Sequence, residues 1–474
     1  MQIEAMQIKA IQIKAMKNKF ISLSASLMFG LAILVSGSAL AVPEIQHWQS
    51  DNGARVMYVP VEGLPMLDVR VVFDAGSARD GELSGLAALT NGLLAEGAGG
   101  LSAQTLAERF ESVGAQLEND SLRDMAYVGV RSLTDKAYLD QALATLSAVV
   151  AKPDFKPQAF ARELARMKVA LTAKKQSPSA IADEAFYQAL YRDHPYAQPP
   201  GGTEASLARL NLAAIKAFYQ QYYVAKNALI VMVGAIDRAR AEAIANNLSQ
   251  QLPSGEQAAP LPAVKPLAES RLVQIQYPSK QVHIYMGQPG VKRGDEDYFS
   301  LYVANHTLGG SGFASRLVET IREKHGLAYS VYSYFLPMRE AGPFMMGMQT
   351  RADQAEQAVT LLQSELEKYL EEGPDEDELA DAVSNIVGSF PLNLDGNNKL
   401  LGYLTMIGFY DLSKDYLNTF VERVKSVSQD DAAAAMASRI DADKMVTVIV
   451  GDIAAGESAA AATAADSKGS SPRE

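Results

Sequence analysis

Apolar and polar residues alternate along two parts of the chain in the same order. In the first part, the alternation over Ala54–Pro60 and Leu67–Ala75 predicts two β-strands. The second part opens in the same way, with alternating runs over Arg271–Tyr277 and Gln281–Gly287. A helical segment follows each pair of strands. We therefore expect the two parts to share one structural plan.

A further strand and a long amphipathic helix come next in each part. Met125–Leu133 and Phe344–Gln349 are the predicted strands, and apolar residues follow both at spacings of three and four. The apolar stripes consist of Leu139, Leu143, Leu146 and Val150 in the first part and of Ala355, Val359, Leu362, Leu366 and Tyr369 in the second. Such a stripe predicts a helix that packs on one face of a sheet.

Each part closes with an apolar strand, Ala228–Gly234 or Met445–Gly451, and an acidic residue follows within three positions. This order predicts an α+β fold with two homologous domains, each a largely antiparallel sheet with helices packed on it. We place the domains at residues 42–252 and 270–453. Unrelated α+β domains can share such an order of elements, but the matched closing strands favour a true repeat.

Two segments have no regular period of apolar residues. Residues 253–269 are rich in proline, and this composition predicts a linker between the domains. Residues 454–474 consist mainly of alanine, serine and glycine with scattered charges, which predicts a disordered tail.

The beginning of the chain has the pattern of an export signal. Lys17 and Lys19 precede an apolar run over Phe20–Val35, and small residues follow at Ala39 and Ala41. We expect residues 1–41 to be a signal peptide that is cleaved after Ala41, with either Met1 or Met16 as the initiator. The 474-residue chain has no cysteine and can form no disulfide. An exported chain without disulfides or a membrane anchor fits a bacterial periplasm best, and we place it there.

The charge of the chain excludes some classes of partner. With 43 basic and 55 acidic residues, the formal net charge is −12. Nucleic acid and anionic lipid attract clustered lysine and arginine, so we expect neither as a partner. No run after the signal peptide approaches the roughly 20 apolar residues that span a bilayer, so we expect no membrane anchor.

A metal site without cysteine needs histidine and carboxylate ligands, and the histidines are few. They are His47, His194, His283, His306 and His325. No two of them are four residues apart, the spacing that directs two imidazoles to one ion from a single helix. The sequence around His194, Asp193-His-Pro-Tyr196, favours a loop-stabilising hydrogen bond. We therefore expect no metal bound by this chain.

Two motifs in the first part carry a family resemblance. Asp74–Asp80 and Ser84–Gly92 resemble the start of the catalytic domain of pitrilysin/insulinase-type (inverzincin) metallopeptidases. In that family, Gly-Leu-Ala leads into a helix with the motif H-x-x-E-H, whose histidines bind zinc and whose glutamate is the general base. The resemblance places Ala88 and Gly92 at the histidine positions and Asn91 at the glutamate position.

The third zinc ligand of the family, a glutamate, would fall near Val169 or Ala170, and neither residue is a carboxylate. Methyl groups and hydrogen atoms offer no lone pair to zinc, and an amide is not a base at neutral pH. This resemblance therefore implies a degenerate zinc motif that holds no metal and has no catalytic residues.

The second part keeps a longer match. Leu308–Leu317 and Ile321–Tyr332 resemble the signature of the family's C-terminal domain. The resemblance implies a fold like that of mitochondrial processing peptidase, and it assigns Arg322 and Tyr329 to an arginine–tyrosine pair that binds substrate and its transition state. Locally, we expect a helix that ends before Gly326, followed by a strand over residues 327–335.

Three glycines, Gly309, Gly310 and Gly312, lie within the first of these two matches. A phosphate-binding loop would need a Lys-Ser or Lys-Thr pair after the glycines, and neither follows. We predict a flexible turn that borders the peptide cleft.

Together, these features predict a non-catalytic, substrate-binding subunit of a heteromeric periplasmic zinc metallopeptidase that acts on peptides or small unfolded proteins. Its partner would be a zinc-bearing peptidase subunit of the same family, and zinc would be bound by that partner. Two alternatives remain open. The chain is a scaffold or binding protein that reuses the fold without a role in catalysis, or it is a self-sufficient peptidase with an unrecognised zinc site.

Overall fold

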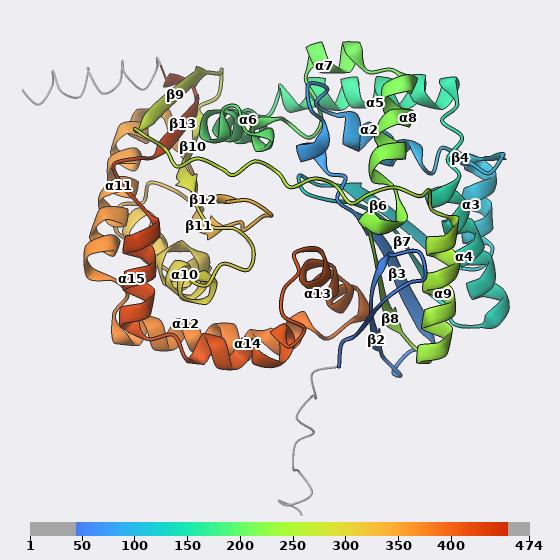
Figure 1. Ribbon diagram of the computed structural model, residues 1–474. Helices are drawn as coiled ribbons and strands as arrows, with labels where there is room; N and C mark the ends of the chain where they lie inside the picture. Colours follow the sequence, from blue (N-terminus) through green and yellow to red (C-terminus); the bar gives the residue numbers. More distant parts are fainter. Residues whose placement is uncertain (1–43, 454–474) are drawn as a thin grey trace, which may run out of the picture. The chain divides into compact units, whose positions relative to one another are not determined.

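The computed structural model of the chain describes residues 44–453 (Figure 1). The predicted signal peptide and the predicted tail lie outside the described residues. None of the helices in the described part combines the length and the hydropathy needed to cross a bilayer.

The first half of the chain forms a six-stranded sheet with the order β1-β2-β8-β3-β7-β6. Its strands are β1 (Gln46–Gln49), β2 (Arg55–Pro60), β8 (Ala228–Gly234), β3 (Met66–Phe73), β7 (Ala126–Leu133) and β6 (Gln116–Ser121). β2 and β8 run parallel, and every other neighbouring pair is antiparallel. A separate two-stranded ribbon pairs β4 (Gly97–Ala98) with β5 (Leu101–Ser102).

The second half forms a five-stranded sheet with the order β11-β12-β10-β13-β9. Its strands are β11 (Val331–Phe335), β12 (Pro343–Arg351), β10 (Gln281–Pro289), β13 (Val446–Gly451) and β9 (Arg271–Gln276). β9 and β13 run parallel and the other pairs are antiparallel, so β2-β8-β3-β7-β6 corresponds to β9-β13-β10-β12-β11 strand for strand. The predicted repeat and the predicted α+β fold are confirmed.

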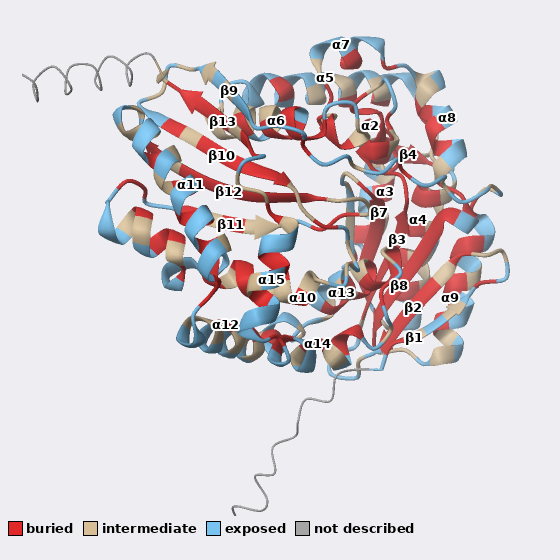
Figure 2. Cartoon of the chain, turned by 60° about the vertical axis from the view of Figure 1, so that its left-hand side comes forward, coloured by how far each residue is buried: buried red, intermediate tan, exposed pale blue. Residues whose placement is uncertain are grey.

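Helices cover the sheets. Those of the first half are α2 (Leu86–Leu93), α3 (Ala103–Glu111), α4 (Lys136–Ala151), α5 (Pro157–Lys174), α6 (Pro178–Tyr191), α7 (Glu204–Arg209), α8 (Leu212–Tyr222) and α9 (Arg238–Gln251). Those of the second half are α10 (Tyr298–Asn305), α11 (Ala355–Glu372), α12 (Glu376–Ser389), α13 (Asn397–Phe409), α14 (Tyr416–Lys425) and α15 (Gln429–Arg439). Figure 2 shows the result, with buried residues concentrated along β3, β8 and β13 and exposed residues on the outer faces of the helices.

The predicted amphipathic stripes face the sheets. On α4, Leu139, Leu146 and Val150 are buried, and on α11 the buried residues include Leu362, Leu366 and Tyr369. Capping residues fix where such helices begin, because the first backbone N–H groups of a helix have no partner within it. The Asp135 carboxylate accepts from the N–H of Ala137 at the start of α4.

One helix of each half packs against the sheet of the other half. α6 lies against β10 and β13 of the second sheet (Figure 1). Phe186 of α6 is fully buried and meets the ring of Tyr285 edge-on, with 6.4 Å between ring centroids. The same apolar cluster contains Val446, Val448 and Val450 of β13.

The reciprocal helix is α13, which lies against β2, β3 and β8 of the first sheet (Figure 1). Gly408 allows a close approach, because a Cβ at this position would lie 2.5 Å from the sulfur of Met57 and 2.8 Å from Leu229. Arg55 donates to the carbonyl oxygen of Gly408 at 2.8 Å. Each sheet is therefore covered in part by a helix from the other half, although the two halves are separated in the sequence by residues 253–269.

The proline-rich segment runs over the surface of both halves. Residues 253–269, all of them described, contain neither helix nor strand. Leu261 and Leu267 are buried, and the guanidinium of Arg79 donates to the carbonyl oxygen of Ala259 at 2.7 Å. Proline-rich chain without regular structure can thus follow a fixed path when its few apolar side chains find a packing surface.

A buried carboxylate joins the two halves beside the exchanged helices. Asp124, from the first half, accepts hydrogen bonds from the hydroxyl of Tyr196 at 2.5 Å, the hydroxyl of Tyr410 at 3.0 Å and the backbone N–H of Arg339 at 2.7 Å. Burial raises the pKa of Asp124, and these donors oppose the shift. Two of the three donors belong to the second half.

We expect the close approach of α13 to be intolerant of a larger side chain. Gly408→Leu should lower the free energy of unfolding by about 1–3 kcal/mol, since the added atoms would overlap Met57 and Leu229. Gly402 is the matched control: it lies on the same helix with no atom near its Cβ position, so Gly402→Leu should be neutral or stabilising. Urea unfolding of the two variants measures the difference, and equal midpoints would contradict this packing.

Candidate functional site

The degenerate motif lies on α2, and a buried aspartate sets the start of that helix. The Asp80 carboxylate accepts from the backbone N–H groups of Gly85 and Ala87, each at 2.7 Å. α2 presents Ala88 and Gly92 one turn apart, and both are partly exposed. The helix therefore has the geometry of a motif helix but carries a methyl group and a hydrogen atom at the two ligand positions.

Asn91, at the position of the general base, is built into a structural network. It is buried, and its amide nitrogen donates to the carbonyl oxygen of Tyr127 at 3.1 Å and to the hydroxyl of Tyr223 at 3.4 Å. Its amide oxygen accepts from Asn119 of β6 at 2.7 Å. All the hydrogen-bonding groups of this side chain thus have protein partners, and Asn91 connects α2 to β6, β7 and α8.

The structure brings one carboxylate to the motif helix that the sequence analysis did not find. A Cβ at Gly92 would lie 3.9 Å from a carboxylate oxygen of Glu163 on α5, and Glu163 is buried next to Arg166, its ion-pair partner. Val169 and Ala170, where the third ligand was expected to fall, are exposed. The signal that could have identified Glu163 is its spacing of four from Ala159, a buried residue on the same helix.

These residues do not fit a zinc ion. One carboxylate that is already paired with arginine, a methyl group and a hydrogen atom fall short of the three protein ligands that a catalytic zinc needs. Within residues 44–453, no group of three or more histidine, aspartate or glutamate side chains has the arrangement of a metal site. No chemical step can therefore be derived through a metal in this chain.

The structure does bring Arg322 and Tyr329 together. The guanidinium carbon of Arg322 lies 5.0 Å from the ring centroid of Tyr329 and 4.7 Å from that of Phe313. Both rings are unusually exposed for aromatic side chains, with 84% of Tyr329 and 77% of Phe313 accessible to solvent. Stacking between an arginine and aromatic rings fixes the plane of the guanidinium and leaves its edge, with the N–H donors, available.

The secondary structure around Arg322 and Tyr329 differs in part from the predicted helix and strand. Arg322 lies in a short π-helix over Val318–Lys324, which ends before Gly326 as expected, and π-helical turns are rare and frequent at functional sites. The predicted strand over residues 327–335 begins only at Val331, so Tyr329 lies in a loop. The reason is that the carbonyl of Leu327 accepts from the hydroxyl of Thr350 at 2.6 Å, which anchors the loop to β12 without a strand ladder.

The glycine-rich stretch is also different from the prediction. Gly309 and Gly310 are not a flexible turn but part of a second π-helix, His306–Gly310. A Cβ at Gly309 would lie 2.6 Å from the backbone nitrogen of Ser333, so glycine is needed there for close packing against β11. Gly312 is exposed with φ +63° and open space around it, and it alone fits the predicted turn.

Two family models match the chain, and the boundary between their matches lies within the first half. Residues 62–204 match the family described as insulinase (peptidase family M16), and residues 209–386 match the description "peptidase M16 inactive domain". A crystal structure of a peptidase M16 inactive domain from Pseudomonas fluorescens is 38% identical, with a TM-score of 0.83, and the match covers 86% of this chain and 98% of that one. The chain belongs to peptidase family M16.

Two M16 relatives carry different names. A Helicobacter pylori protein named non-peptidase homolog YmxG is 27% identical over 410 residues, which cover 85% of this chain and 92% of that protein. A Streptomyces coelicolor protein named an uncharacterized zinc protease is 28% identical over 273 residues, and that match spans only 58% of its length. With Ala88, Asn91 and Gly92 at the positions that the family resemblance assigns to H-x-x-E-H, this chain is consistent with a non-catalytic M16 homologue.

An arginine that the sequence analysis did not single out holds the segment of Arg322 in place. Arg316, just before the π-helix of Arg322, makes two 2.6 Å contacts to the carboxylate of Glu378 and donates to the carbonyl of Gly373 at 2.8 Å. Its side chain is largely buried, so this two-point ion pair is stronger than a surface pair. It fixes the segment that carries Phe313 and Arg322 onto α12.

The histidines of this M16 chain have structural surroundings. His194 makes the predicted loop contact: one ring nitrogen accepts from the N–H of Tyr196, and the other lies 2.8 Å from the carbonyl oxygen of Pro262. Burial lowers the pKa of His194, and also those of His283 on β10 and His306. The lower pKa keeps each of these imidazoles neutral at physiological pH.

The carboxyl group that begins the M16 motif helix should make stability depend on pH. Burial raises the pKa of Asp80 from 3.8 to about 7, although the N–H groups of Gly85 and Ala87 act in the opposite direction. Between those pH values Asp80 keeps its proton in the folded protein and has lost it in the unfolded chain. The contribution of this proton to the free energy of unfolding is therefore complete below about pH 4 and disappears as the pH rises through 7. Its steepest slope is about 1.4 kcal/mol per pH unit.

Asp80→Asn removes this titrating group. We expect unfolding free energies measured by urea titration from pH 5 to pH 8 to decline less steeply with pH for the variant than for the parent. Parallel curves for the two proteins would show that Asp80 does not titrate in this range.

Proposed function

We propose that this chain is the substrate-binding, non-catalytic subunit of a heteromeric periplasmic zinc metallopeptidase that acts on peptides or small unfolded proteins. The observation that carries the proposal is the contrast between the two halves. The motif helix has lost every group that zinc hydrolysis needs, whereas Arg322 and Tyr329 lie together at the surface in a rigid setting. Zinc and the general base would come from an M16 partner that carries H-x-x-E-H.

The chemistry of the pair suits a role in binding a peptide carbonyl. Guanidinium and phenol groups both donate hydrogen bonds, and a preorganised donor stabilises the oxyanion that forms when water attacks a carbonyl. The side chain of Arg322 has one weak ion pair, at 3.5 Å to its neighbour Glu323, so a bound carbonyl faces little competition from within the protein.

The aromatic rings support the same role. The guanidinium of Arg322 lies over the rings of both Phe313 and Tyr329, and both aromatic side chains remain largely exposed. Large exposed aromatic side chains are uncommon on a protein that has no partner, and they are typical of residues that bind one. An apolar side chain of an extended peptide could pack on these rings while its backbone carbonyl accepts from Arg322.

The cellular setting follows from the sequence. The signal-peptide pattern of residues 1–41 supports export to a periplasm. The partner subunit would be exported in the same way, and the acidic net charge of −12 would disfavour nucleic acid as a competing ligand.

We expect the pair to be needed for turnover and not for assembly. With the zinc-bearing M16 subunit from the same cells, Arg322→Ala should lower kcat/KM for a fluorogenic peptide by about 100-fold or more, because a transition-state donor is lost. Tyr329→Phe removes only the hydroxyl and should lower it less, by about 10-fold. Size-exclusion chromatography should show unchanged heteromer formation for both variants.

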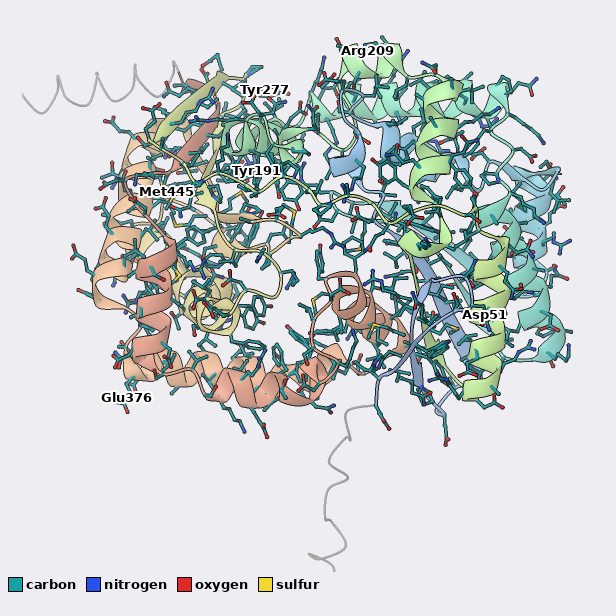
Figure 3. All side chains as sticks on the ribbon, viewed as in Figure 1. Asp51, Tyr191, Arg209, Tyr277, Glu376 and Met445 are labelled. Carbon is teal, nitrogen blue, oxygen red and sulfur yellow. The ribbon has the colours of Figure 1, made fainter. Side chains whose placement is uncertain are left out.

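Two residues distant from the pair serve as matched controls. Arg209 lies on α7, at an outer edge of the chain (Figure 3), and Tyr138 lies exposed on α4. Arg209→Ala and Tyr138→Phe should leave kcat/KM unchanged. If Arg322→Ala and Tyr329→Phe also leave it unchanged while the heteromer forms, the chain is a scaffold and the proposed role is wrong.

Metal content separates the proposal from a self-sufficient peptidase. We expect the purified mature chain to contain far less than one zinc per chain by elemental analysis, even after incubation with zinc and removal of the excess. We also expect no chelator-sensitive peptide cleavage by the chain alone. One tightly bound zinc together with such cleavage would overturn the assignment of zinc to the partner.

A further inference from the structure

A pocket lies in the second half between α10, the π-helix His306–Gly310 and the end of β11. Its volume is about 310 Å³, near the lower limit for pockets that bind small ligands. Much of its lining is aromatic, and the rings belong to Tyr298, Tyr302, Tyr334 and Phe335. All four side chains are only partly buried, so a ligand can reach them. The size of the pocket suits a group about as large as one amino-acid residue.

One polar residue of the pocket is an arginine without a counter-charge. The Nε of Arg293 is buried and has no hydrogen-bond partner, and in the described part of the chain Arg293 forms no ion pair. The neighbouring acid Asp295 pairs with Arg439 instead, at 2.9 Å. The guanidinium carbon of Arg293 lies 5.5 Å from the ring centroid of Tyr298 and 5.7 Å from that of Tyr410, so two rings limit its movement. A buried N–H donor without an acceptor is uncommon in proteins and indicates a missing partner.

A second polar residue of the pocket offers an unused acceptor. The Nε2 of His306 is buried and has no partner, whereas the side chain bonds to Asn385 of α12. That bond acts to raise the pKa of His306, so the ring is its donor, and the donating atom is Nδ1 because Nε2 is unpaired. Burial lowers the pKa and keeps the ring neutral. A neutral imidazole that donates through Nδ1 has a lone pair on Nε2, which can accept a hydrogen bond.

We propose that this pocket binds the carboxyl-terminal residue of a peptide whose last side chain is aromatic. The Nε–H of Arg293 and a neighbouring Nη–H lie on one edge of the guanidinium and match the two oxygens of a carboxylate. The backbone N–H of the same peptide residue is a donor for Nε2 of His306. Its aromatic side chain would pack on the rings that line the pocket. The identity of the ligand as a peptide rests on the proposed function, whereas the donor, the acceptor and the rings do not.

Other occupants fit the pocket less well. Water satisfies either nitrogen atom, but it leaves the charge of Arg293 without a counter-ion and the rings without an apolar contact. Sulfate would pair with Arg293, yet it has no apolar part and no donor for His306. A free amino acid has the carboxylate and the side chain, but its ammonium group would add a second positive charge close to Arg293. The amide N–H of a peptide donates without that charge.

The pocket also lies close in the sequence to the residues assigned to catalysis-linked binding. The π-helix lines the pocket at His306 and at Gly310, and Phe313 follows three residues later. The ring of Phe313 carries the guanidinium of Arg322. A peptide that is held at its carboxyl terminus would therefore be tethered to the segment that leads to Arg322, and tethering raises the effective concentration of the rest of the peptide there.

Calorimetric titration of the purified mature chain, without a partner subunit, tests the pocket. N-acetyl-phenylalanine has the carboxylate, the amide N–H and the aromatic ring, and we expect it to bind. N-acetyl-phenylalaninamide lacks only the negative charge and should bind at least 10-fold more weakly. Free phenylalanine should also bind more weakly than N-acetyl-phenylalanine. Because no cleavage is measured, failure here is distinct from failure of the proposed function, which is judged by the effect of Arg322→Ala on turnover.

Substitutions assign the binding to this pocket. Arg293→Met should weaken binding of N-acetyl-phenylalanine at least 10-fold, and His306→Phe, which keeps a ring and removes the acceptor, by about 3- to 10-fold. Arg293→Lys keeps the charge without the two-point contact and should weaken binding several-fold, which provides a second test if Arg293→Met does not fold. Arg209→Met on α7 is the matched control and should leave the affinity unchanged.

Four outcomes would each overturn the proposal. The first is that none of the probes binds, which would mean that the pocket holds water only. The second is equal affinity for N-acetyl-phenylalanine and its amide, and the third is tighter binding of free phenylalanine. The fourth is unchanged affinity in folded Arg293→Met.

Discussion

The exchange of one helix between the two halves is the constraint on which the rest of the structure depends. α6 contributes to the apolar core on the second sheet and α13 packs on the first sheet, so each sheet has a face that is covered by a helix from the other half. Asp124 reinforces the exchange, because its buried carboxylate draws hydrogen bonds from Tyr196 in one half and from Tyr410 and Arg339 in the other. Removing any of these donors would leave a buried acceptor short of partners, which costs more than the net gain from an ordinary hydrogen bond.

The motif helix α2 has structural contacts of its own within the first half. α2 is held at its start by Asp80 and at its middle by Asn91, and both residues bind other parts of the first half rather than a metal. The helix is therefore held in the fold by contacts that involve no metal. The surface that carries Arg322 is built separately, on two π-helical turns and the ion pair between Arg316 and Glu378, so it does not depend on the state of the motif.

The sequence predicts the parts of this structure that local periodicity controls. The repeat, the strands and the stripes of α4 and α11 follow from alternation and from spacings of three and four, which each segment carries in itself. The same pattern could not assign α6 and α13 to the opposite sheets. An apolar stripe predicts that one side of a helix is buried, but it does not identify the sheet that buries it. The loop at Tyr329 and the close packing at Gly309 depend on contacts with Thr350 and Ser333, which are distant in the chain. Glu163 was missed because the third ligand was placed by counting residues, whereas the fold brings Gly92 next to a side chain one helix turn from Ala159.

The network around Asn91 also bears on whether catalysis could return to this half. An amide is both a donor and an acceptor, and here its donors meet the carbonyl of Tyr127 and the hydroxyl of Tyr223 while its acceptor meets Asn119. An ionised glutamate has acceptors only, so at this position it would face the Tyr127 carbonyl without a proton between them and would be buried without a cation. Two histidines at Ala88 and Gly92 would have to arrive together with that glutamate, since the metal they bind is what would compensate its charge. We therefore expect Asn91→Glu alone to lower stability without completing a metal site.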